Sequence, residues 1–118
     1  METIYLQLNF LPPSVNSLYK PLRPSYDGVS RLRRFQIDIL EHLEPYIDGC
    51  DKIKGPVRVE ICFYMSGSHR RDIDNYIKPL IDQIKNILIE DDCMIHQLYV
   101  EKFIGCDKDL TVIKINKL

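Results

Sequence analysis

Two aspartates separated by a single residue, Asp72 and Asp74, are the side chains of this sequence that point most directly to chemistry. Two carboxylates at close range repel each other unless a cation lies between them. Hard oxygen ligands at this spacing suit Mg²⁺. Arg70 and Arg71 come just before them, and guanidinium groups can hold a phosphate against such a metal through bidentate contacts. The segment therefore indicates metal-assisted chemistry on a phosphate ester.

Lys78 is a candidate catalytic residue on the helix predicted to follow these aspartates. One turn beyond Asp74, its ammonium group could stabilise the extra negative charge of a transition state. A simpler interpretation is an exposed ladder of ion pairs, because Asp74, Lys78 and Asp82 are spaced four residues apart. Asp74 could likewise cap the helix, with Asp72 a solvated loop residue. The spacing alone leaves both interpretations open.

A second acidic group, Glu90 to Asp92, follows the same predicted helix. Carboxylates at a helix C-terminus face the unfavourable end of the helix dipole, so a shared metal or solvation must compensate. A helix of about 16 residues is ~24 Å long, which is too long for Asp92 to reach Asp74 along a straight helix. Either the helix is shorter or bent, or the next strand runs back, or Asp92 is supplied from elsewhere.

Alternation of apolar and polar residues predicts the strands that position these side chains. The four predicted strands are Thr3 to Phe10, Val57 to Tyr64, about Ile95 to Phe103, and Leu110 to Ile115. The last two flank the turn Gly105 to Asp109 and are expected to form a hairpin.

Helical spacing predicts two amphipathic helices. The first is expected from an N-cap at Ser30 to about Glu44, before Pro45, and the second carries a buried stripe from Ile73 to Leu88. Pro12 to about Val29 is expected to be a long loop. The order βαβαββ predicts one α+β domain over residues 1–118, a mixed sheet with two helices packed on it.

Composition narrows the class of protein. The chain has 118 residues, 45% hydrophobic and 28% charged, as in an ordinary soluble domain. No apolar run approaches the ~20 residues needed to span a bilayer, so no membrane partner is expected. The four cysteines form no CxxC pair, which predicts a reduced cytoplasmic protein without a zinc site.

The net charge of −1 argues against a strongly basic nucleic-acid binder, yet the basic residues cluster locally. A solvated helix face can produce the same clustering. The candidate DNA-binding residues are Asn16, Lys20, Arg23, Arg33, Arg34, Arg70 and Arg71.

Two runs of this sequence resemble the RusA family of crossover junction endodeoxyribonucleases. Asp72-Ile73-Asp74-Asn75, with Lys78, Asp82 and then Asp91-Asp92, resembles the family signature DxDNxxKxxxDAL…DD. Residues 12–19, Pro-Pro-Ser-Val-Asn-Ser-Leu-Tyr, are similar to its PPSxNxxY run. The resemblance covers essentially the whole chain. It implies that Asp72, Asp74 and Asp92 are metal-binding and catalytic, that Lys78 is the catalytic lysine, and that Asp91 is an adjacent candidate ligand.

The resemblance also implies a homodimer that binds branched DNA and resolves Holliday junctions in recombination and repair. Mg²⁺ is the implied cofactor, with Mn²⁺ as a substitute and no organic cofactor, and genes of this kind are frequently carried by prophages. A two-fold dimer suits a four-way junction, which is two-fold symmetric and must be cut on two opposing strands.

Two other hypotheses compete with this one. A dimeric DNA-binding protein that keeps the fold without cutting is disfavoured, because all the acids and Lys78 are present. A phosphatase of the HAD type, with a nucleophilic aspartate in its DxD, needs a larger doubly wound domain than 118 residues in this order supply.

Overall fold

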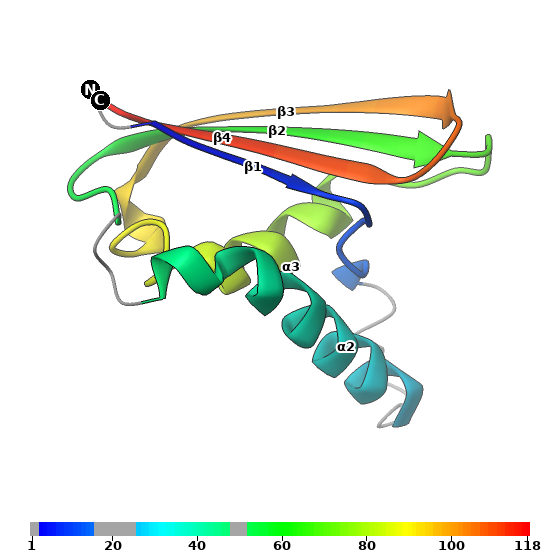
Figure 1. The fold of residues 1–118 in the computed structure, drawn as a ribbon. Coiled ribbons are helices and arrows are strands. Elements are labelled where there is room, and N and C mark those ends of the chain that lie inside the picture. The colour runs from blue at the N-terminus through cyan, green and yellow to red at the C-terminus, as the bar shows by residue number, and fades with distance from the viewer. Residues whose placement is uncertain (1–2, 16–25, 48–51) are drawn as a thin grey trace.

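Four strands form one mixed sheet, and two helices cover one of its faces (Figure 1). The structure is a computed structural model that describes residues 3–15, 26–47 and 52–118. The strands are β1 (Thr3–Leu8), β2 (Val57–Ser66), β3 (Ile95–Cys106) and β4 (Leu110–Lys117), and the helices are α2 (Tyr26–Leu43) and α3 (Asp74–Ile84). Short 3-10 turns, η1 (Glu44–Tyr46) and η2 (Asp92–Met94), follow α2 and precede β3. The predicted α+β class with two helices on a mixed sheet is confirmed.

The core lies between the sheet and the helices, because strand side chains point alternately to opposite faces. Alternate residues of β2 from Val57 to Met65 are buried, and Phe35, Ile39 and Leu43 of α2 pack against the same layer. The opposite face of the sheet carries exposed side chains such as Tyr5 and Tyr99 and has no helix over it among the described elements (Figure 1). No described helix is long and apolar enough to cross a membrane.

The strand order, β1-β4-β2-β3, corrects the predicted hairpin. β4 pairs antiparallel with both β1 and β2, whereas β3 pairs parallel with the other side of β2. β4 buries Thr111, Ile113 and Ile115, and a central position beneath the helices keeps these side chains away from solvent. Most β3 side chains are exposed, and β3 therefore forms an edge of the sheet.

Helix α2 begins earlier than predicted, at Tyr26, so Ser30 lies inside the helix and is not its N-cap. The sequence assigns Gly28 to the loop, but a glycine inside a helix costs only about 1 kcal/mol relative to alanine. The helix ends at Leu43, close to the predicted end before Pro45. Residues 16–25 of the predicted loop lie outside the described residues.

Helix α3 is shorter than the periodicity indicated and ends at Ile84. Lys85 is extended, and Asn86 adopts a left-handed conformation with φ of 67°, which asparagine tolerates better than most residues. Leu88 is buried as predicted, but it lies beyond the helix, where its carbonyl accepts from the Ile53 N–H at 2.9 Å. The chain turns back at this point and carries the second acidic group toward α3.

Candidate active site

Asp72 and Asp74 stand at the start of α3, both exposed to solvent. Asp72 precedes the helix, as predicted, whereas Asp74 is the first residue of the helix and does not precede it. The N-cap is Ile73, and no side chain caps the helix end. The interpretation of Asp74 as the helix cap is therefore wrong, and its side chain is exposed to solvent.

The loop that carries Asp72 is tied to the turn between β3 and β4. Asp109 Oδ1 accepts from the Ser66 backbone N–H at 2.8 Å and from the Ser66 hydroxyl at 2.9 Å. The same oxygen lies 3.9 Å from Arg71 Nη1. Lys102 Nζ donates to the carbonyl of Arg71, and this contact comes from the edge strand β3. We call these contacts the Asp109 clamp. They hold the loop at Ser66, where it begins, and at Arg71, just before Asp72.

The two neighbouring arginines are placed differently. The side chain of Arg70 is 91% exposed and lies 3.7 Å from Asp72, whereas that of Arg71 is only 14% exposed. Arg71 Nε also donates to His69 Nε2 at 2.7 Å. Arg70 is thus free to meet a phosphate, while Arg71 is held within the protein by its own contacts.

A hollow of about 550 Å³ lies between α3, η2 and the first half of β3. We call it the acidic groove. Its polar lining includes Asp74, Lys78 and Asp92. Because α3 ends at Ile84 and the chain turns back, Asp92 reaches the same groove as Asp74 in one chain. The sequence left open whether this helix is shorter than its periodicity indicates, and the structure shows that it is.

Lys78 forms the expected ion pair on α3, with its ammonium 3.3 Å from Asp82 Oδ1. Asp82 also pairs with Lys85 at 3.8 Å, so it anchors two cations. The Lys78 side chain is 67% exposed, and exposed pairs of this spacing contribute only about 0.3 to 0.5 kcal/mol. Lys78 can therefore leave Asp82 for a phosphate at small cost.

Asp91 and Asp92 do not lie at the C-terminus of α3, which corrects the dipole argument made from the sequence. Asp91 is the N-cap of η2 and accepts from the Asp92 N–H at 2.9 Å. That hydrogen bond, together with one from the Cys93 thiol, lowers the pKa of Asp91. The Asp91 carboxylate is thus occupied in capping, and the Asp92 side chain is exposed at the groove.

The donors of the acidic groove suit Mg²⁺, which takes oxygen ligands and is commonly held by one or two carboxylates together with substrate phosphates. Asp74 and Asp92 supply carboxylates to the groove, whereas Asp72, two residues before Asp74, is not among its lining residues. Within the described parts of the chain, no three His, Cys, Asp or Glu side chains stand together as a group that could hold a metal by themselves.

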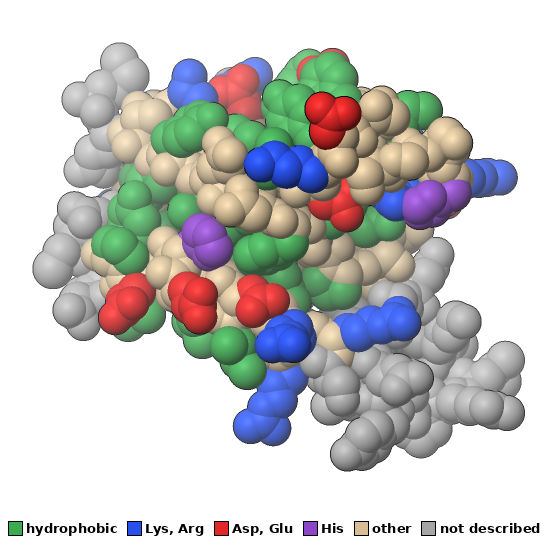
Figure 2. Space-filling model, turned by 45° about the vertical axis from the view of Figure 1, so that its right-hand side comes forward, with side chains coloured by type: hydrophobic (Ala, Val, Ile, Leu, Met, Phe, Trp, Pro, Cys, Tyr) green, Lys and Arg blue, Asp and Glu red, His purple; other side chains and the backbone are tan. Residues whose placement is uncertain are grey.

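The candidate DNA-binding residues are spread over the surface. Arg33 is exposed on α2, and Arg34 lines a separate pocket with Phe10. Asn16, Lys20 and Arg23 lie outside the described residues. Figure 2 shows acidic side chains in a row along part of one face, with basic side chains beside them. Charge is therefore segregated locally although the net charge is −1.

The sequence gives no sign of the Asp109 clamp. Asp109 is predicted only as part of a turn, and nothing in its spacing from Arg71 indicates contact, because the two residues meet through the fold of the sheet. Lys102 is likewise predicted only as part of a strand.

Comparison with known proteins places these residues in a family. The family model "Endodeoxyribonuclease RusA" matches residues 23–116. A protein of Aquifex aeolicus (strain VF5) named crossover junction endodeoxyribonuclease RusA is 29% identical over 117 residues, which cover 98% of this chain and 92% of that protein. The family match spans both helices, the acidic groove and the Asp109 clamp. The chain belongs to the RusA family of endodeoxyribonucleases.

Proposed function

We propose that this protein is a divalent-metal-dependent endonuclease that resolves Holliday junctions in recombination and repair by cutting two opposing strands. The observation that carries the proposal is the acidic groove, where Asp74, Lys78 and Asp92 line one hollow in a chain of this family. The relative from Aquifex aeolicus bears the name of a crossover junction endodeoxyribonuclease. Because the proposed substrate is cellular DNA, we also expect a cytoplasmic location.

In the proposed reaction Asp72, Asp74 and Asp92 hold Mg²⁺, with Mn²⁺ as a substitute. When bound, the metal supplies an activated water and a Lewis acid for hydrolysis of a phosphodiester. The ammonium group of Lys78 offsets the negative charge that builds on the phosphate, and Asp82 holds Lys78 at the rim until DNA binds. Arg70 contacts a neighbouring phosphate. The products are a 5′-phosphate and a 3′-hydroxyl.

We further propose that two copies associate through β3. This edge strand leaves one row of backbone N–H and C=O groups without a neighbouring strand among the described elements. It also exposes Leu98, Phe103 and Ile104. Leu98 lines the acidic groove, so a second copy docked on β3 would lie against the site. A two-fold dimer then presents two sites to a two-fold junction.

Cleavage of a supercoiled plasmid with an extruded cruciform tests the proposal. Wild-type protein should linearise the plasmid in Mg²⁺ or Mn²⁺ and leave it intact in EDTA. Ca²⁺ should support junction binding without cleavage, because it neutralises the carboxylates but has a looser coordination shell. Junction binding without cleavage in either Mg²⁺ or Mn²⁺ would favour the alternative of a DNA-binding protein that does not cut.

A further inference from the structure

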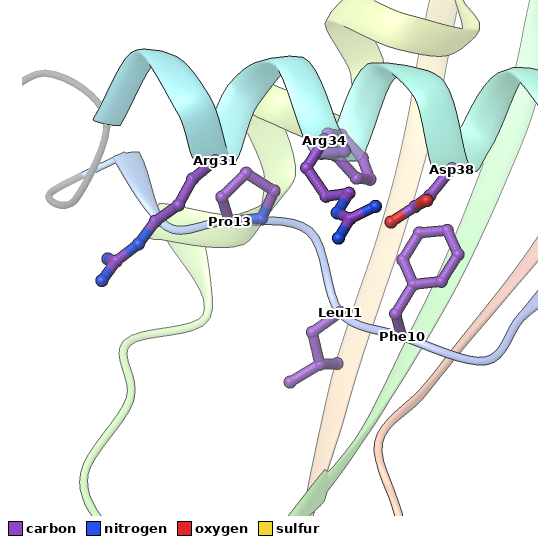
Figure 3. Close-up of a pocket in the computed structure, with 7 residues that line it drawn as sticks. Phe10, Leu11, Pro13, Arg31, Arg34 and Asp38 are labelled. Atoms are coloured by element: carbon purple, nitrogen blue, oxygen red, sulfur yellow. The ribbon is translucent and has the colours of Figure 1, made fainter. Parts of the chain in front are cut away.

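A second hollow, of about 400 Å³, lies between α2 and the segment that follows β1 (Figure 3). We call it the Phe10 pocket. It shares no lining residue with the acidic groove. Its lining consists of Phe10, Leu11, Pro13, Arg31, Arg34, Phe35 and Asp38. The proposed reaction uses none of these side chains.

The floor of the Phe10 pocket is apolar and held in place. The Phe10 ring meets the ring of Phe35 edge-on, with centroids 6.0 Å apart, and that of His42 at 5.7 Å. The carbonyl of Phe10 accepts from Thr111 Oγ1 at 2.7 Å, which fixes the backbone to β4. Flat faces of aromatic and apolar side chains are the surfaces on which nucleobases stack, whatever their sequence. A ligand here meets a floor that is already ordered.

The rim of the pocket is polar. Arg31 and Arg34 are exposed on α2, and Asp38 is half-buried one turn further along. Figure 3 shows Arg34 and Asp38 pointing toward each other beside the Phe10 ring, with Arg31 extended toward solvent. Guanidinium groups bind phosphate, and a carboxylate accepts from the exocyclic amino group of a base. An apolar floor with this rim matches one nucleotide, whose base is adenine, cytosine or guanine.

Two side-chain contacts connect the Phe10 pocket to the loop of the proposed active site. Thr111, which holds Phe10, lies near the start of β4. Asp109, just before that strand, contacts Arg71, the neighbour of Asp72. The pocket and the loop are therefore fastened to the same end of the sheet.

We propose that the Phe10 pocket binds one unpaired nucleotide of the junction, taken out of the base stack near the point of strand exchange. This inference rests on the proposed function, because it concerns how the same enzyme holds its DNA. An extruded base loses its stacking and pairing in the duplex, and the apolar floor and the Asp38 carboxylate replace them. Arg31 then holds the phosphate of the same nucleotide.

The test combines base removal in the DNA with substitutions in the pocket. Junction binding is measured in Ca²⁺ for a series of junctions, each with one abasic nucleotide near the exchange point, so that a base is lost while its phosphate stays. We expect one position at which base removal weakens binding about 5- to 150-fold, the range for losing one stacked base. The Asp38→Ala protein should bind the intact junction more weakly and lose little further affinity at that position.

Two matched variants on the same helix control for charge. Glu41→Ala removes an exposed acid and Arg33→Ala removes an exposed arginine, and neither residue lines the pocket. Both should retain the full effect of the abasic position, whereas Arg31→Ala should weaken binding more than Arg33→Ala. Wild-type binding that is indifferent to every abasic position overturns the inference, and so do independent, additive effects of Asp38→Ala and base removal.

Other occupants of the pocket give distinguishable results. If a second copy or another segment of this chain covers it, Asp38→Ala will change the oligomeric state or the thermal stability while the abasic series shows no effect, which overturns the inference. A protein that cuts the intact junction in Mg²⁺ but ignores base removal retains the proposed function without the pocket's role. A protein that neither binds nor cuts junctions would contradict both the proposed function and the role of the pocket.

Discussion

Arg70 and Arg71 have the same side chain and adjacent places in the sequence, yet the fold gives them different surroundings. Replacing Arg70 with alanine should change the free energy of unfolding by less than about 0.5 kcal/mol, as for other exposed sites, and weaken junction binding. It should also flatten the dependence of binding on salt, because one phosphate contact is lost. Titrations with a junction at several salt concentrations measure both effects.

Arg71→Ala should behave in the opposite way, lowering the free energy of unfolding by about 0.5 to 3 kcal/mol, the usual range for destabilising substitutions, because it removes a largely buried side chain that contacts Asp109 and His69. Urea denaturation of the two variants side by side provides the comparison. Equal stability of the Arg70 and Arg71 variants would show that the contacts of the Arg71 side chain contribute nothing to stability.

The carboxylates of the acidic groove carry the proposed chemistry. Asp74→Asn and Asp92→Asn should abolish cleavage while the fold and junction binding persist, since each removes a charged metal ligand and little volume. Lys78→Ala should bind DNA and cut about 100- to 1000-fold more slowly, the usual cost of losing one transition-state donor. Single-turnover cleavage in Mg²⁺ and binding in Ca²⁺ separate the two properties.

Asp107→Asn is the matched control for these two asparagine variants, because Asp107 is exposed in the turn after β3 and lies outside the groove. It should cut normally. Near-normal cleavage by Asp74→Asn would refute the assignment of that residue.

Among the elements, the turn between β3 and β4 matters most for the site, because Asp109 in that turn holds Ser66 and Arg71. Asp109→Ala should loosen the loop that carries Asp72 and raise the Mg²⁺ concentration needed for half-maximal cleavage. Asp107→Ala, in the same turn, should not. Hydrogen exchange of residues 67–73 reports the loosening independently of activity, and unchanged exchange in the Asp109 variant would contradict this account.

The edge strand β3 is the element that we assign to dimerisation. Leu98→Lys replaces an exposed apolar side chain that lines the acidic groove with a charged one. This change should weaken self-association at least about tenfold. Tyr5→Lys, on the exposed face of β1 at the opposite edge of the sheet, is the control and should leave the dimer intact. Sedimentation over a range of concentrations distinguishes them. A Leu98→Lys protein that dimerises normally would place the interface elsewhere.

At the scale of the whole molecule, paired cleavage requires two sites on one junction. Mixed dimers of wild-type and Asp74→Asn chains should therefore convert a supercoiled cruciform plasmid to nicked circles, whereas wild-type dimers give linear molecules. Gel electrophoresis separates the products. A wild-type protein that sediments as a monomer at working concentration, yet linearises the plasmid in one binding event, would overturn the dimer.

A second mixture asks whether each site is built from one chain or from two. The acidic groove places Asp74 and Asp92 on one hollow of a single chain. Mixed dimers of Asp74→Asn and Asp92→Asn chains keep one intact site only if Asp92 crosses to the partner's site. Nicking by this mixture means shared sites, and a plasmid that stays supercoiled means sites supplied by one chain each.

Local spacing along the chain was enough to predict most of the elements and the class of the fold. Burial of one sheet face imposes a period of two on β2 and β4, so the alternation of their residues predicts both strands. The helical spacing of Phe35, Ile39 and Leu43 predicts a helix for the same reason. Asp72, Asp74 and Lys78 could be singled out because chemistry constrains their types and spacing over one short stretch.

The meeting of distant segments, in contrast, depends on the assembled fold. The periodicity of apolar residues predicts that Leu88 is buried, but it does not predict that α3 ends at Ile84. A residue can be buried in any backbone conformation. The pairing of β3 with β2 instead of β4 depends on which strand the helices cover, a comparison between whole arrangements of the chain. The same holds for Arg71 and Asp109, whose contact exists only once the sheet has formed.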